Sequence, residues 1–328
     1  MKIELNKEHN TLSGGSMPIK IASESLHACS GCEISILDMG EKLLELLEFA
    51  AIVHLPLLMD SKHDSPKKNP RTIKLPKADV GLISGGIKTR EHLEVARALR
   101  KSCDLIVALG TCATHGGIPA LANSYGNDDL LGRCFNTKGT DKADSFPSDG
   151  VPGMMDTCSA LDEHISVDIF LPGCPPHPDH IFKALESIEK KELFSLPDKS
   201  VCDNCPATRN GNGQVKALKR SLELPNWRVY EGKEDFICFL EQGFLCMGPV
   251  TKDGCGGNTD SARCIMAQVP CRGCYGPVKK EGNQRLAMLN ALASNGIDIS
   301  SLPETVSMLR FSGGHGLLRP IDRRKESK

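Results

Sequence analysis

Residues 104–117 read DLIVALGTCATHGG, and this stretch decides the fold. The apolar run from Asp104 to Leu109 predicts a buried strand, and glycine and Cys112 follow it at once. Short continuous apolar runs of this kind are typical of parallel sheets, whose two faces are both covered by helices. A cysteine directly after such a strand lies at the sheet edge where α/β proteins place their sites.

The same alternation extends outward on both sides of this stretch. Further strands are predicted at residues 19–21, 51–58, 79–84 and 167–171, and helices at 34–49, 90–101 and 179–190. Strands separated by helices indicate a parallel sheet with helices on both faces. Residues 126–163 show no clear period and are predicted to form a long loop or insertion. After Pro197 the alternation stops, and a single later helix is predicted at 283–293.

Length, charge and hydropathy exclude several classes of protein. The chain has 328 residues and a net charge of -1, so no basic excess points to nucleic acid. No run of eighteen apolar residues predicts a membrane span, and the N-terminal sequence has no signal-peptide pattern. We therefore expect a cytoplasmic protein, in which the fifteen cysteines serve as metal or redox ligands rather than as disulfides.

Four cysteines follow predicted strands of the first half. They are Cys29 and Cys32 of a CSGC segment, Cys112 of GTCATHGG, and Cys174 of PGCPP. Parallel strands end at one edge, so these thiols are expected to converge there, and the surrounding glycines let the backbone approach a bulky inorganic group. A thioredoxin-like CxxC pair, or small buried hydrophobes, are the alternatives for these cysteines.

Eight more cysteines crowd the second half. They are Cys202, Cys205, Cys238, Cys246, Cys255, Cys264, Cys271 and Cys274. Eight thiolates are enough for two four-cysteine sites, which bind zinc or iron–sulfur clusters. Few large apolar residues lie between Pro197 and Pro277, so bound metal is expected to organise much of this half.

The three segments CSGC, GTCATHGG and PGCPP resemble those of the small subunit of nickel–iron hydrogenases. The resemblance implies a flexible N-terminus at 1–16, a flavodoxin-like domain at 17–196 and an iron–sulfur domain at 197–328. It also implies that Cys29, Cys32, Cys112 and Cys174 hold a proximal 4Fe-4S cluster, facing the nickel–iron site of a large subunit. A related subunit of respiratory complex I shares part of the pattern, but it is shorter and lacks the cysteine-rich second half.

The resemblance also implies two further ligand sets, for three 4Fe-4S clusters in all. Cys202, Cys205, Cys238 and Cys246 match a distal site, with cysteine at Cys202 where many relatives have histidine. Cys255, Cys264, Cys271 and Cys274 match a medial site, and Cys264 stands where relatives with a three-iron cluster have proline. The division of the eight cysteines rests on spacing and is least firm at Cys238 and Cys255.

The missing export signal, the cysteine at the distal site and the segment 246–277 most resemble methyl-viologen-reducing, deazaflavin-nonreducing hydrogenases. The resemblance implies an electron-transfer subunit with a nickel–iron large subunit and an electron-accepting iron–sulfur or flavin subunit as partners, linked to heterodisulfide reductase. The alternatives are the small subunit of a deazaflavin- or NAD-reducing hydrogenase and, in another class, a zinc-binding interaction protein.

Some residues of these motifs have more than one interpretation. Glu33, next to Cys32, is a candidate proton relay, although a solvated or capping role suits it equally. His115 either contacts a cluster sulfur or the partner, or is a plain turn histidine. Cys103 is expected in the core, while Cys134 and Cys158 have no assigned role.

Overall fold

The computed structural model describes residues 17–60, 73–137, 139, 146, 149–192, 194–209, 217–219, 236–258, 261–279, 282–302 and 309–311. The predicted flexible segment 1–16 lies outside these residues. We call residues 17–196 the sheet region and residues 197–328 the cysteine-rich region. The domain boundary between them stays a prediction.

Five strands form one parallel sheet in the sheet region. They are β1 (Ile19–Ser25), β2 (Ala50–His54), β3 (Ala78–Ser84), β5 (Cys103–Leu109) and β7 (Ile169–Leu171). Their order is β2-β1-β3-β5-β7, with every neighbouring pair parallel. With the second strand outside the first and the others following in sequence, this is the flavodoxin-like order. The predicted α/β fold class is confirmed.

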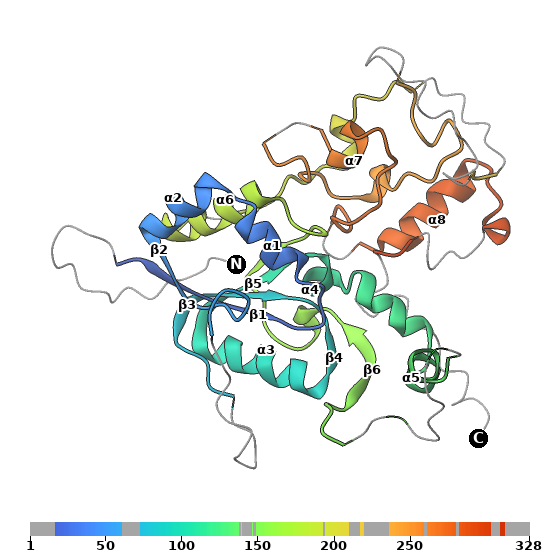
Figure 1. Cartoon of the computed structure of the whole chain (residues 1–328). Helices are drawn as coiled ribbons and strands as arrows, with labels where there is room; N and C mark the ends of the chain where they lie inside the picture. Colours follow the sequence, from blue (N-terminus) through green and yellow to red (C-terminus); the bar gives the residue numbers. More distant parts are fainter. Residues whose placement is uncertain are drawn as a thin grey trace.

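Helices cover both faces of this sheet. Helices α1 (Gly31–Leu37), α2 (Glu41–Phe49) and α6 (Pro178–Glu189) lie on one face, and α3 (Arg90–Ser102) lies on the other (Figure 1). On the first face α6 buries Ile181 and Leu185, and on the second α3 buries Leu99. Each such side chain stabilises the fold by about 1.5–3 kcal/mol through removal of apolar surface from water.

The structure differs from the sequence prediction in three places. The predicted helix 34–49 is two helices, because Gly40 between them has φ +61°, which breaks the helical path. The predicted strand 51–58 ends at His54. Residues 126–163 are not one loop, since they contain α5 (Asn127–Phe135) and β6 (Met154–Ser159). Strand β6 pairs antiparallel with β4 (Ile87–Thr89), outside the main sheet.

The described residues of the cysteine-rich region have little regular structure. Their helices are α7 (Arg263–Met266) and α8 (Gln284–Ser294), with single 3-10 turns at Val201–Asn204, Gly248–Val250 and Ile299–Ser301. The predicted helix 283–293 is therefore confirmed. Three phenylalanines and α8 form the core of the cysteine-rich region. The ring of Phe239 lies 5.1 Å from that of Phe236 and 6.4 Å from that of Phe244.

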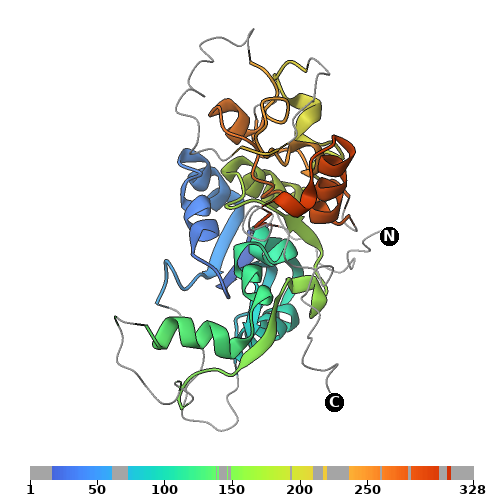
Figure 2. The ribbon, with the colours of Figure 1, turned by 90° about the vertical axis from the view of Figure 1, so that its right-hand side faces the viewer.

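The cysteine-rich region lies at one end of the sheet, next to α1 and α4 (Thr111–His115), as the two views show (Figures 1 and 2). At this end Ser25, Ser84, Leu109 and Leu171 are neighbours in register. No described helix is long and apolar enough to cross a membrane.

Candidate functional site

The structure brings the proximal set, Cys29, Cys32, Cys112 and Cys174, to the carboxyl ends of neighbouring strands. Cys29 lies in the loop after β1, Cys32 in α1, Cys112 in α4 after β5, and Cys174 in the turn after β7. Burial, followed by the nearby thiols of Cys174 and Cys29, raises the pKa of Cys112 to about 12. The convergence expected from the strand ends is therefore present in the structure.

Glycines make room for these sulfur atoms. A Cβ at Gly110 would lie 2.3 Å from Sγ of Cys32, and one at Gly117 would lie 3.1 Å from Sγ of Cys112. Both glycines have positive φ, +86° and +53°, which side chains rarely adopt. The backbone thus leaves space around the thiols, and the four soft sulfur donors suit an iron–sulfur cluster.

Glu33 is 3 % exposed and lies beside these thiols. Its Oε1 accepts a hydrogen bond from Oγ of Ser84 at the end of β3, and its Oε2 has no partner among the described residues. Among the charged and thiol neighbours of Cys32, Glu33 raises the thiol pKa most, after burial itself. The solvated role for Glu33 is wrong, because the carboxyl group is buried, and no cap hydrogen bond is made at the start of α1.

His115 is also buried, at 7 % exposure. Its Nδ1 lies 2.8 Å from Oγ1 of Thr114, and a Cβ at Gly276 would lie 2.6 Å from its ring. The ring therefore packs against the cysteine-rich region rather than lying in an open turn.

The distal set, Cys202, Cys205, Cys238 and Cys246, gathers at the other side of the cysteine-rich region. Burial raises the pKa of Cys202 to about 12, a value that includes a lowering by Arg209 and smaller increases from the thiols of Cys246, Cys205 and Cys238. A Cβ at Gly248 would lie 3.0 Å from Sγ of Cys202 and 3.6 Å from Sγ of Cys246. Here too, a glycine makes space between sulfur atoms.

The medial set lies between the other two. Burial, followed by the thiols of Cys255 and Cys264, raises the pKa of Cys274 to about 12. Cys271 of the medial set contacts the distal set, since its N–H donates to Sγ of Cys246 at 3.3 Å. Burial, followed by the thiols of Cys246 and Cys274, raises the pKa of Cys271. Motif spacing does not predict this contact, because the two cysteines are 25 positions apart in the sequence.

The three remaining cysteines occupy different surroundings. Cys103 is 5 % exposed in the core, as expected, and Cys134 is exposed on α5. Cys158, on β6, is fully buried and close enough to raise the pKa of Cys112. It is thus a fifth thiol beside the proximal set. Its neighbourhood depends on the β4–β6 pairing, which the sequence pattern did not reveal.

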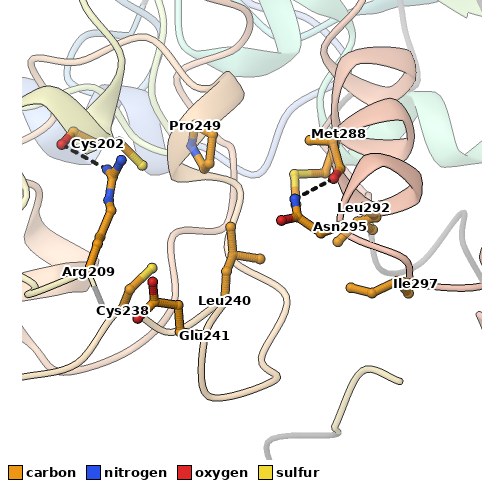
Figure 3. A pocket seen from close by; sticks show the side chains of 11 residues that line it. Cys202, Arg209, Cys238, Leu240, Glu241, Pro249, Met288, Leu292, Asn295 and Ile297 are labelled. Carbon is orange, nitrogen blue, oxygen red and sulfur yellow. Dashed lines mark hydrogen bonds between the residues drawn. The ribbon is translucent and has the colours of Figure 1, made fainter. Parts of the chain in front are cut away.

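No group of His, Cys, Asp or Glu side chains among the described residues is arranged to hold a single metal ion. A cavity of about 200 Å³ opens beside the distal set (Figure 3). Cys202, Cys238 and Arg209 line one side, and Met288 and Leu292 of α8 line the other. Arg209 donates to the carbonyl oxygen of Cys202 at 3.2 Å.

Comparison with known proteins places this chain in a family. Residues 29–188 match the family described as NADH ubiquinone oxidoreductase, 20 Kd subunit, a match that stops before the first cysteine of the distal set. The solved NAD+-reducing nickel–iron hydrogenase in its dihydrogen-reduced state is 31% identical, with a TM-score of 0.49, over 55% of this chain and 96% of that one.

Two curated relatives span most of the chain. One is a vhu-type F420-non-reducing hydrogenase subunit of Methanocaldococcus jannaschii, which is 35% identical over 298 residues, covering 90% of this chain and 95% of the relative. The other, an F420-non-reducing hydrogenase iron-sulfur subunit of Archaeoglobus profundus, is 32% identical, covering 85% and 88%. Both alignments extend well beyond residue 188 and so include the cysteine-rich region. The chain belongs to the family of iron–sulfur small subunits of F420-non-reducing nickel–iron hydrogenases.

Proposed function

We propose that this chain is the electron-transfer subunit of a cytoplasmic F420-non-reducing hydrogenase and that it holds three 4Fe-4S clusters. One observation carries the proposal, namely that the three thiol sets form a continuous row. Oγ1 of Thr111, next to Cys112 of the proximal set, donates to the carbonyl oxygen of Cys274 in the medial set, and the N–H of Cys271 in the medial set donates to Sγ of Cys246 in the distal set.

The ligands of each cluster are proposed from this row. Cys29, Cys32, Cys112 and Cys174 hold the proximal cluster, Cys255, Cys264, Cys271 and Cys274 the medial cluster, and Cys202, Cys205, Cys238 and Cys246 the distal cluster. Clusters of this type supply one-electron redox chemistry, with potentials tuned by burial and hydrogen bonds to sulfur. The glycines at 110, 117 and 248 and the buried thiols fit groups of this size and chemistry.

The nickel–iron site belongs to a partner large subunit. Cys29 and Cys174 are exposed, and Ile34, Leu37 and Ile118 beside the proximal set are exposed large apolar residues. An apolar rim around accessible thiols is the kind of surface that a protein partner covers. The proposed docking face for the large subunit is therefore the end of the sheet that carries Cys29 and Cys174.

Glu33 is proposed to hold and pass a proton at its Oε2 atom. This oxygen is buried, has no hydrogen-bond partner within the described part of the chain and lies beside the proximal set, so a proton placed there is shielded from bulk water. Ser84 fixes the carboxyl group through its other oxygen. The Glu33→Gln variant keeps the shape and removes the acid, so hydrogen oxidation should fall while the iron content stays constant.

The electron acceptor is proposed to be an iron–sulfur or flavin subunit linked to heterodisulfide reductase. The support is the resemblance in segment 246–277 and the names of the curated relatives, which are hydrogenases that do not reduce F420. Native co-purification with identification of the bound chains tests this directly. Recovery of an F420- or NAD-reducing partner instead would favour the alternative hydrogenase class.

Metal and sulfide analysis of the anaerobically purified chain tests the cofactor proposal. About twelve irons and twelve acid-labile sulfides per chain are expected for three four-iron clusters. A content of about eight irons per chain would mean that the chain holds two clusters and not three. Stoichiometric zinc without sulfide would contradict the proposal and identify a zinc-binding protein instead.

A further inference from the structure

Thr111 connects the proximal and medial sets through its hydroxyl group. The side chain is 1 % exposed, and Oγ1 donates a hydrogen bond to the carbonyl oxygen of Cys274. The same Oγ1 accepts the N–H of Gly173 at 3.1 Å. One hydroxyl therefore touches the residue before Cys174 and the backbone of Cys274, which are a hundred positions apart in the sequence.

The backbone of Thr111 strengthens this arrangement. Its N–H donates to the carbonyl oxygen of Gly173 at 2.8 Å, so Thr111 and Gly173 are joined by two hydrogen bonds. Cys112 and Cys174 are the next residues along these two segments. The hydroxyl of Thr111 thus links these two segments to the backbone of Cys274 from the sheet side.

Gln284 of α8 holds the segment of Cys274 from the other side. Its Nε2 donates to the carbonyl oxygens of Gly273 at 3.0 Å and Gly276 at 3.2 Å. The side chain is 3 % exposed, so water does not compete for these bonds. Residues 273–276 are consequently held on both flanks by Gln284 and at Cys274 by Thr111.

We infer that Thr111 is a positioning residue, which holds the segments of Cys112 and Cys174 against that of Cys274 so that electrons cross between the proximal and medial sets at this contact. The inference rests on the proposed function and specifies where the relay is closest. From the sulfur of Cys112 the route runs through the backbone to the side chain of Thr111, and across its hydrogen bond to the backbone and sulfur of Cys274. Tunnelling through bonds and a hydrogen bond is more efficient than tunnelling through space.

The electron balance needs no further reagent. Oxidation of dihydrogen on the nickel–iron partner releases two protons there and two electrons, which cross this contact singly and leave to the electron-accepting subunit. Thr111 neither gains nor loses a bond in this process. Its role is to keep the separation and the hydrogen bond constant while electrons pass.

Three variants of the full chain in its native complex test the role. Thr111→Val keeps the shape and removes the hydroxyl, and Thr111→Ser restores it. Thr114→Val is the matched control, because Thr114 lies in the same short helix, is 4 % exposed and contacts residues of the sheet region: the carbonyl oxygens of Gly110 at 3.1 Å and Thr111 at 3.4 Å and Nδ1 of His115 at 2.8 Å. Its hydroxyl therefore stays within the sheet region.

For Thr111→Val we expect unchanged iron and sulfide content. Amide exchange at Gly173 and at residues 274–276 should be at least about tenfold faster, since a buried hydrogen bond is lost. The magnetic interaction between the reduced proximal and medial clusters should weaken in electron paramagnetic resonance spectra. Reduction of the distal cluster after mixing with dihydrogen should slow several-fold. Thr111→Ser and Thr114→Val should match the parent protein in the last two measurements.

Two results would overturn the inference. Spectra and reduction rates of Thr111→Val that equal those of Thr114→Val would show that the hydroxyl does not set the connection. Loss of iron in Thr111→Val would assign Thr111 to cluster assembly instead. Failure of the proposed function is distinguishable, because it appears as missing iron and sulfide in the parent protein before any variant is compared.

Discussion

The sheet region and the cysteine-rich region present thiols in two different ways. In the sheet region, the cysteines follow strands that are joined to one another by backbone hydrogen bonds, which need no bound group. The pairing of Leu109 with Leu171 fixes the spacing of β5 and β7, the strands before Cys112 and Cys174. In the cysteine-rich region, the thiols are held by turns and short helical segments such as Gly248–Val250 and α7. The proximal set is therefore expected to be preorganised, while the other two sets depend on what they bind.

Removal of iron should give the largest difference in stability between the two regions. After anaerobic chelation, amide hydrogens in residues 236–276 should exchange almost as in an unfolded chain, because the metal replaces much of the missing regular structure. Strands β1, β3 and β5 should stay protected. Hydrogen-exchange mass spectrometry of the chain with and without iron measures both regions at once. Equal loss of protection in the two regions would contradict a preorganised proximal set.

A pair of glycine variants tests how closely the sheet region fits its thiols. Gly110→Ala requires alanine to adopt a φ of +86° and places its Cβ 2.3 Å from Sγ of Cys32. The variant should therefore be less stable than the parent by about 1–3 kcal/mol and should bind less iron. Gly132→Ala on α5 meets nothing within 4 Å and should stabilise its helix by about 0.5–1 kcal/mol.

Thermal unfolding and iron analysis of the two alanine variants separate them. Equal iron content in both would show that the space beside Cys32 is not needed for cluster binding.

The sheet region was easier to predict from the sequence than the cysteine-rich region, because its strands are specified by local sequence patterns. The strand at 104–109 and its neighbours were predictable, because a continuous apolar run between turn residues specifies a buried strand locally. The break at Gly40 was not, since a helical pattern continues across it and only the φ of +61° reveals the turn. In the cysteine-rich region, spacing suggested eight ligands in two sets, but not how the sets meet.

The unpredicted contacts at the site are all non-local. Cys158 is held beside the proximal set by the pairing of β6 with β4 and by hydrogen bonds with Asn123, and Cys271 contacts Cys246 from 25 positions away. Thr111 meets Cys274 across the junction of the two regions. Periodicity and motif spacing carry information about neighbours in sequence, and the register between distant segments is set by packing that they do not encode.

A smaller effect is expected at Cys264, a proposed ligand of the medial cluster. Cys264 lies in the first turn of α7, where proline keeps the helix intact. Cys264→Pro should therefore lose about one of twelve irons and leave the other two clusters unchanged. Cys134→Ser is the control, because Cys134 is exposed on α5. Iron analysis and cluster spectra check the assignment, which fails if the Pro variant keeps its full iron content.

The smallest expected effect lies at the junction of the two regions. His180 of α6 is 7 % exposed, and its Nδ1 lies 3.5 Å from the hydroxyl group of Tyr275. Burial, followed by the positive charges of His177 and Lys183, lowers the pKa of His180 from 6.5 to about 4. Between these two pH values the unfolded chain binds a proton at His180 that the folded chain does not.

Protonation of His180 therefore favours the unfolded chain. The contribution of neutral His180 to stability is complete above pH 6.5 and is lost as the pH falls towards 4. Urea unfolding of the anaerobic protein at pH 7 and pH 5 should show a loss that is about 1 kcal/mol smaller in His180→Asn than in the parent. Carboxylates titrate equally in both proteins and cancel. An identical pH dependence would mean that His180 stays accessible to protons, and that the junction opens more readily than the sheet beneath it.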